Sequence, residues 1–76
     1  MSKYDYDMDI VAMKKMELAS MYAPELTPHA AVNRLMRWVA YHPKLTDELR
    51  KTGYRKMSKL LSPKQVELIV EYLCEP

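Results

Sequence analysis

The sequence predicts a mostly helical α+β domain with the order strand, helix, helix, helix, strand, helix and one two-stranded sheet. Three patterns predict it. A short stretch near the N-terminus alternates apolar and acidic residues, two Ser/Thr-Pro pairs mark helix starts, and the single glycine lies where a helix should end. Because the chain has only 76 residues, we expect one domain that spans residues 1–76.

Two segments are expected to form the strands. Between Tyr4 and Ile10, tyrosine, methionine and isoleucine alternate with aspartate, as in a half-buried strand, so we predict a strand at about 4–12. Residues 54–61 (YRKMSKLL) contain no helix-start signal. They predict a second strand at about 56–61 that pairs with the first.

The first and third helices are predicted from apolar spacing and from their ends. The segment KKMELASMYAP predicts a helix at about 14–23, with Lys14 and Lys15 in a solvated first turn, before a proline that ends it. The segment PKLTDELRKTGY predicts a helix at about 44–52. Gly53 then takes the left-handed position after its last turn, and the following tyrosine packs back on it.

The second helix, at about 28–42, begins with a clear signal because Thr27 is a good cap and Pro28 suits the first helical position. At about 100° per residue, one side is apolar and the other is polar with small residues. The predicted core face is Ala31, Val32, Leu35, Trp38 and Val39. The predicted outer face is Ala30, Asn33, Arg34, Arg37, Ala40 and Tyr41.

The last helix, at about 63–74, has the strongest local signal in the chain. In LSPKQV, Ser62 and Gln65 can form a capping box, and the proline after Ser62 suits the first helical position. The leucine before Ser62 can pack on the valine after Gln65 as a hydrophobic staple. Leu68 and Tyr72 fall on the side away from the main apolar stripe. They require a second surface, supplied either by the rest of this domain or by another subunit.

Composition and charge bound the function classes. Hydrophobic residues make up 49% and charged residues 29%, which is typical of a globular protein with a packed core. A single cysteine excludes an intramolecular disulfide, and no segment resembles a signal peptide or a bilayer-spanning helix. We therefore expect a soluble, cytoplasmic protein without membrane contact. The net charge is +2, but the middle of the chain is basic and both ends are acidic.

Enzymatic chemistry is not expected. His29 and His42 would lie about 20 Å apart on one helix, at ~1.5 Å rise per residue, so they cannot share a metal ion or a substrate. One glycine cannot build a phosphate-binding loop, and the N-terminal aspartates lack the glycine and distal glutamate of a calcium loop. Cys74 has no base in view. We expect no catalytic residue, cofactor, metal or small-molecule substrate.

The arrangement of the basic residues favours binding to double-stranded DNA, as an accessory or regulatory factor. Lysines and arginines neutralise phosphates, and arginine and asparagine are the usual readers of base edges. The candidate nucleic-acid-binding residues are His29, Asn33, Arg34, Arg37, Tyr41, Arg55, Lys56 and Lys59. A well-solvated basic face is the plainer interpretation. The alternative function is a protein-interaction or self-associating module that uses Leu68 and Tyr72, or the acidic strand edge.

Two resemblances add to this. ELA, TPHAAVNRLMRW and GYRKMSKLLSPKQVELI are similar to the winged helix-turn-helix of MerR-type regulators and excisionases, which implies a recognition helix followed by a basic wing. ELASMYAPELTPHAAVNRLMRW and LSPKQVELIVEYLCEP, over almost the whole chain, resemble a family of short Bacteroidetes proteins classed as a domain of unknown function. The second resemblance implies no activity. It places an arginine at Met36 in many relatives and a glycine at Cys74.

Overall fold

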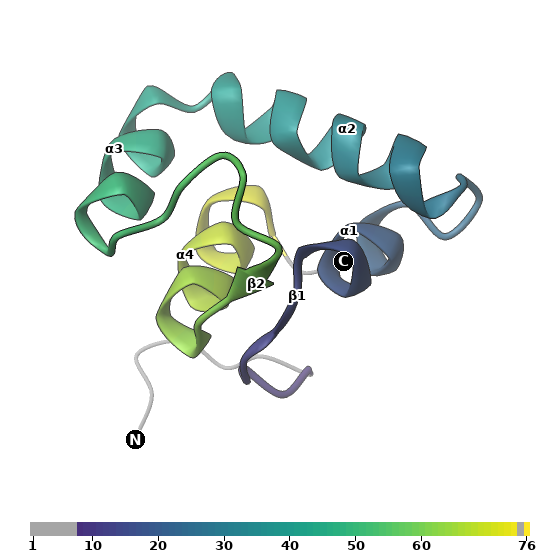
Figure 1. Ribbon diagram of the computed structural model, residues 1–76, viewed down its shortest axis with the longest axis horizontal. Helices are drawn as coiled ribbons and strands as arrows, with labels where there is room; N and C mark the ends of the chain where they lie inside the picture. The colour runs from purple at the N-terminus through teal and green to yellow at the C-terminus, as the bar shows by residue number, and fades with distance from the viewer. Residues whose placement is uncertain (1–7, 75) are drawn as a thin grey trace.

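The structure is a computed structural model that describes residues 8–74 and Pro76 (Figure 1). Its elements are β1 (Met13–Lys14), α1 (Lys15–Tyr22), α2 (Pro28–Ala40), α3 (Pro43–Lys51), β2 (Leu60–Leu61) and α4 (Pro63–Leu73). This order and the antiparallel pairing of β1 with β2 confirm the predicted α+β fold class. The helix ends lie within two residues of the predicted ones.

Both strands are much shorter than predicted. Only Met13↔Leu61 and Lys14↔Leu60 pair, so the predicted strands at about 4–12 and 56–61 are wrong in extent. Residues 4–7 of the first lie outside the described part, while residues 8–12 form no strand. The ladder is short because β2 has two residues between an irregular loop and the cap of α4.

The alternation near the N-terminus nevertheless predicts burial correctly. Met8 and Ile10 pack against the core as half-buried side chains, whereas Asp9 and Val11 are exposed. An extended chain turns successive side chains to opposite sides whether or not a neighbouring strand is hydrogen-bonded to it. The pattern therefore reports on an extended backbone and not on a sheet.

The predicted helix caps are confirmed. The Thr27 hydroxyl accepts from the amide of Ala30 at 3.3 Å, at the start of α2. At α4, the Ser62 hydroxyl accepts from the Gln65 amide at 3.2 Å, and the Gln65 side-chain oxygen accepts from the Ser62 amide at 2.9 Å. These bonds satisfy amide groups that no helical turn can satisfy.

The single glycine ends α3 as predicted. Gly53 has φ of +86°, and its amide donates to the carbonyl of Arg50 at 3.1 Å. The Tyr54 amide donates to the Leu49 carbonyl at 3.2 Å. This pair of bonds is the Schellman motif, in which a left-handed residue reverses the chain. The reversal sends the following loop back toward α2.

The core lies between the four described helices. Its buried apolar side chains are Leu18, Ala19, Ala23, Ala31, Leu35, Val39, Leu45, Leu49, Leu61, Val66, Leu68, Ile69 and Val70. Of the predicted core face of α2, Val32 and Trp38 are only half-buried, which corrects that part of the prediction. Trp38 lies at the margin, where its ring meets the Tyr22 ring edge-on at a centroid distance of 6.1 Å.

α2 runs along one edge of the domain, α1 lies beside it, and α3 and α4 complete the other side (Figure 1). In Figure 1 the loop between α3 and β2 rises from α3 toward α2 before it descends to β2. Within the described part of the chain, no helix is both long enough and apolar enough to cross a bilayer.

Candidate nucleic-acid interface

The outer ridge of α2, which we define as Asn33, Arg37, Ala40 and Tyr41, is exposed. It is exposed because the opposite side of the helix supplies Ala31, Leu35 and Val39 to the core. Tyr41 is 72% exposed and caps the C-terminal end of the helix. Figure 1 shows no other described element on this side of α2, so the ridge is open to a partner.

Arg34, next to the ridge on α2, already has an acidic partner within the domain. Its guanidinium forms an ion pair with Glu25 at 3.3 Å, in the turn between α1 and α2. The Arg34 side chain is 37% exposed and that of Glu25 is 63% exposed. Such a surface pair contributes little stability, but it places an acid beside the arginine and lowers its local positive potential.

The segment between α3 and β2, residues 52–59, is here called the basic loop. It carries Arg55, Lys56 and Lys59, which are all exposed, and it contains no acidic residue. One hydrogen bond from the Ser58 amide to the Arg55 carbonyl, at 2.9 Å, closes a turn within it. The predicted strand, and with it the wing implied by the MerR-type resemblance, is absent from the described residues 54–59.

Lys15 holds the basic loop from beneath. Its side chain is only 5% exposed, its ammonium donates to the Lys56 carbonyl at 2.9 Å, and it lies 4.9 Å from the centroid of the Tyr54 ring. The prediction that Lys15 belongs to a solvated first turn is therefore wrong. Its own amide donates to the Lys59 carbonyl at 2.8 Å, and this contact directs the side chain under the loop.

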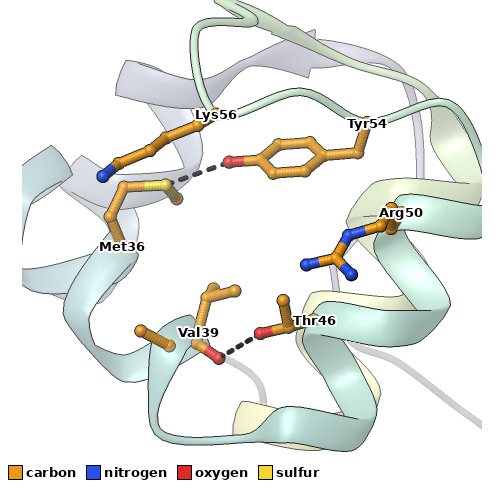
Figure 2. A pocket seen from close by; sticks show the side chains of 7 residues that line it. Met36, Val39, Thr46, Arg50, Tyr54 and Lys56 are labelled. Atoms are coloured by element: carbon orange, nitrogen blue, oxygen red, sulfur yellow. Dashed lines mark hydrogen bonds between the residues drawn. The ribbon is translucent and has the colours of Figure 1, made fainter.

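A pocket of about 320 Å³ separates α2 from α3 and the basic loop. Its apolar wall consists of Met36, Val39 and Ala40 of α2. Its polar residues are Thr46, Arg50, Tyr54 and Lys56. In Figure 2 the Arg50 guanidinium points into this space, and the Tyr54 hydroxyl donates to the Met36 sulfur at 3.0 Å.

The structure places the candidate residues predicted from the sequence in two segments, α2 with its C-terminal end and the basic loop. At about 100° per residue, Arg34 and Met36 lie on opposite flanks of α2. Arg34 meets the α1–α2 turn through Glu25, whereas Lys56 lines the pocket with Met36. Ala40 of the α2 ridge lines the same pocket as Lys56, whereas Arg34, on the flank of α2 away from Met36, pairs with Glu25. His29, exposed in the first turn of α2, lies at the far end of the helix.

Among the described residues, the basic residues of this side have no acidic partner. Within residues 8–74, ion pairs occupy Arg34, Lys51 and Lys64. No ion pair involves Arg37, Arg50, Arg55, Lys56 or Lys59 in the described structure.

The pKa of Lys51 is raised above its ordinary value of 10.5, mainly by the charge of Asp47 and then by that of Glu48.

The alternative protein interface on α4 is corrected by burial. Leu68 is 5% exposed and belongs to the core, while Tyr72 is half-buried against it. The second surface that Leu68 requires comes from the domain itself, because Leu68 is part of the buried core cluster. Leu68 is therefore not available to a partner.

Cys74 caps the end of α4 with φ of 69° and ψ of 167°. This region of backbone conformation is essentially reserved for glycine, so the residue is strained. Its thiol is free and exposed, and its carbonyl accepts a hydrogen bond from the Tyr22 hydroxyl.

Arg50 and Tyr54, which line the pocket, are not among the candidate residues predicted from the sequence, and Lys15 is buried where a solvated side chain was predicted. A signal existed for Arg50, because Thr46 and Arg50 are four residues apart on α3, beside the buried Leu45 and Leu49. The Thr46 hydroxyl donates to the Val39 carbonyl at 2.9 Å, which fixes that flank of α3 against α2. No comparable signal marked Lys15, whose partner lies 41 residues away.

A family model described as a domain of unknown function (DUF4248) matches residues 10–76. No curated protein and no solved structure matches the chain. The match covers every described helix and both strands.

Proposed function

The chain belongs to the DUF4248 family, a domain of unknown function, and we propose that it acts as a nucleic-acid-binding accessory or regulatory factor. The observation that carries the proposal is that Arg37 of the α2 ridge and Arg55, Lys56 and Lys59 of the basic loop have no acidic partner among the described residues. Cations without protein counter-charges bind phosphates most readily because no ion pair must first be broken.

The basic loop lies against α2, and Ala40 of the α2 ridge lines the same pocket as Lys56 of the loop. The Tyr54 hydroxyl of the loop touches the Met36 sulfur of α2, and Lys56 shares the pocket with that methionine. On this proposal Arg37 contacts phosphates from the α2 ridge and Lys56 from the basic loop, while Asn33 meets base edges from the ridge. Lys15 adds a positive charge beneath the loop, again without an acidic partner in the described structure.

The experiment is a titration of fluorescent duplex DNA at several salt concentrations. Each phosphate neutralised contributes about 0.9 to the slope of log K against log salt. An Arg37→Ala/Lys56→Ala variant is therefore expected to bind more weakly and to lose about 2 from that slope.

The control is a Lys51→Ala/Lys64→Ala variant, which removes the same charge from residues that already pair with acids of their own helices. It should keep the wild-type slope. The proposal fails if the wild type does not bind at low salt, or if the two variants lose affinity equally. Arg34→Ala, whose residue pairs with Glu25, should change binding less than Arg37→Ala.

A second candidate, self-association or contact with another protein, is favoured by two exposed apolar side chains at the end of the basic loop. Met57 is 87% exposed and Leu60 is 67% exposed. Sedimentation over a range of concentrations tests self-association, and a Met57→Ser/Leu60→Ser variant should reduce it. A mass that stays monomeric at all concentrations would exclude the self-associating form of this candidate.

A further inference from the structure

The pocket between α2, α3 and the basic loop has the size and lining of a small-ligand site. Its volume of about 320 Å³ lies at the lower end of the range of about 300–1,000 Å³ for ligand pockets. One wall is apolar, and the cationic group opposite it is an arginine (Figure 2). Ligand pockets in general combine an apolar lining with a few convergent polar groups.

The charge of the pocket selects an anion. The Arg50 guanidinium points into it, and the stem of Lys56 follows its rim (Figure 2). No carboxylate lines the pocket, and neither cation forms an ion pair within residues 8–74. An arginine presents two parallel N–H donors that match the two oxygens of a carboxylate.

Of the two hydroxyl groups in the pocket, that of Tyr54 could donate a hydrogen bond to an anionic ligand. The Thr46 hydroxyl already donates to the Val39 carbonyl at 2.9 Å. The Tyr54 hydroxyl donates only to a thioether sulfur, which is a weak acceptor. A ligand carboxylate within reach would be a better acceptor for this phenol, so binding would replace the bond between Tyr54 and Met36.

We propose that this pocket binds a small organic monoanion, a carboxylate on a compact apolar body. The carboxylate takes the Arg50 guanidinium, and the apolar body lies against Met36 and Val39. A neutral apolar molecule would leave the arginine without a counter-charge, and a bare inorganic anion would leave the apolar wall in water. Binding at this pocket can be measured without nucleic acid, although Lys56 lines the pocket and also belongs to the proposed nucleic-acid interface.

The test uses 1-naphthoate as the probe, followed by calorimetry and by the methyl signals of the methionines. We expect 1-naphthoate to bind and to shift the Met36 methyl signal, while the signal of the exposed Met16, on α1, stays unchanged. The neutral analogue 1-naphthalenemethanol should bind about tenfold or more weakly, because it has neither the negative charge nor the second oxygen that pair with the guanidinium.

Variants separate the site from general attraction to a basic protein. Arg50→Gln should weaken 1-naphthoate binding about tenfold or more, and Arg50→Lys should weaken it less because the charge remains without the fork. Lys44→Gln removes the same charge from the first turn of α3, outside the pocket lining, and should change nothing. Thermal unfolding of each variant checks that the exposed substitutions leave the fold intact.

Three results would overturn the proposal. They are equal affinity of the wild type and Arg50→Gln for 1-naphthoate, equal affinity of the wild type for the neutral analogue, and displacement of 1-naphthoate by an equal concentration of inorganic phosphate. Binding of 1-naphthoate without any binding of DNA would support the pocket while removing the proposed function. The reverse result would remove the pocket and leave the proposed function standing.

Discussion

The ammonium of Lys15 lies 4.9 Å from the centroid of the Tyr54 ring and donates a hydrogen bond to the Lys56 carbonyl. One buried cation thereby joins the start of α1 to the loop that follows α3. A buried ammonium is costly unless hydrogen bonds and an aromatic face replace its water. The position of the basic loop, and of the pocket beside it, depends on this contact.

Lys15→Met should therefore loosen the basic loop. The methionine keeps the apolar stem but removes the bond to the Lys56 carbonyl and the contact with the Tyr54 ring. We expect amide hydrogen exchange in residues 52–59 to accelerate about tenfold, as the loss of about 1.4 kcal/mol of local stability implies. Lys14→Met, a change at an exposed neighbour, is the control. Equal exchange in the two variants would show that the lysine does not hold the loop.

The Gln65 side chain should stabilise more than its own helix. Its side-chain oxygen accepts a hydrogen bond from the Ser62 amide, and its side-chain nitrogen donates one to the Thr52 hydroxyl at 3.0 Å. The Thr52 hydroxyl in turn donates to the Leu49 carbonyl at 2.6 Å. Gln65→Ala removes both hydrogen bonds of the Gln65 side chain, together with the packing of a side chain that is only 8% exposed. Urea unfolding should give a loss of about 2 kcal/mol for Gln65→Ala, against about 1 kcal/mol for Ser62→Ala.

A double-mutant cycle isolates the link between α3 and α4. Gln65→Ala and Thr52→Ala should be coupled by about 1 kcal/mol, because each removes the same hydrogen bond. Gln65→Ala and Thr27→Ala, which alters the cap of another helix, should simply add. Additivity in both pairs would contradict the proposed link.

Cys74→Gly should raise the free energy of unfolding. With φ of 69° and ψ of 167°, Cys74 occupies a region that costs about 1–3 kcal/mol for a residue with a side chain. Glycine removes this cost while the Tyr22 hydroxyl keeps its carbonyl acceptor. Cys74→Ser, with the same backbone restriction, should remain near the wild type. If both variants have the same urea midpoint, the strain is not stored at this residue.

The raised pKa of Lys51 predicts a dependence on pH and on salt. A folded-state pKa above the unfolded value means that the contribution to stability is present below about pH 10.5 and is lost as pH rises through the folded pKa. NMR titration should show a larger fall in the Lys51 pKa for Asp47→Asn than for Glu48→Gln, since Asp47 is the larger cause. Salt should reduce both effects, because the pair is at the surface.

Sequence patterns predict which side chains of the candidate site face outward, but not which residues they contact. The outward position of Arg37 follows from helical periodicity, and the basic character of residues 52–59 is evident in the sequence. The pairing of Arg34 with Glu25 is not evident in the sequence, because the geometry of the turn between α1 and α2 cannot be predicted from the residues alone. Leu68 shows the same limit, because periodicity places it on a second side of α4 without saying what covers that side.

The sequence by itself determined where the helices begin and end. Ser62 with Gln65, Thr27 with the amide of Ala30, and Gly53 with Arg50 are each contacts within three residues, so their geometry is decided locally. The tertiary structure alone decided which lysine is buried, how short the sheet is and that a pocket opens beside Arg50. Each of these results depends on segments far apart in the chain, such as residues 15 and 56, which only the packing of the whole core brings together.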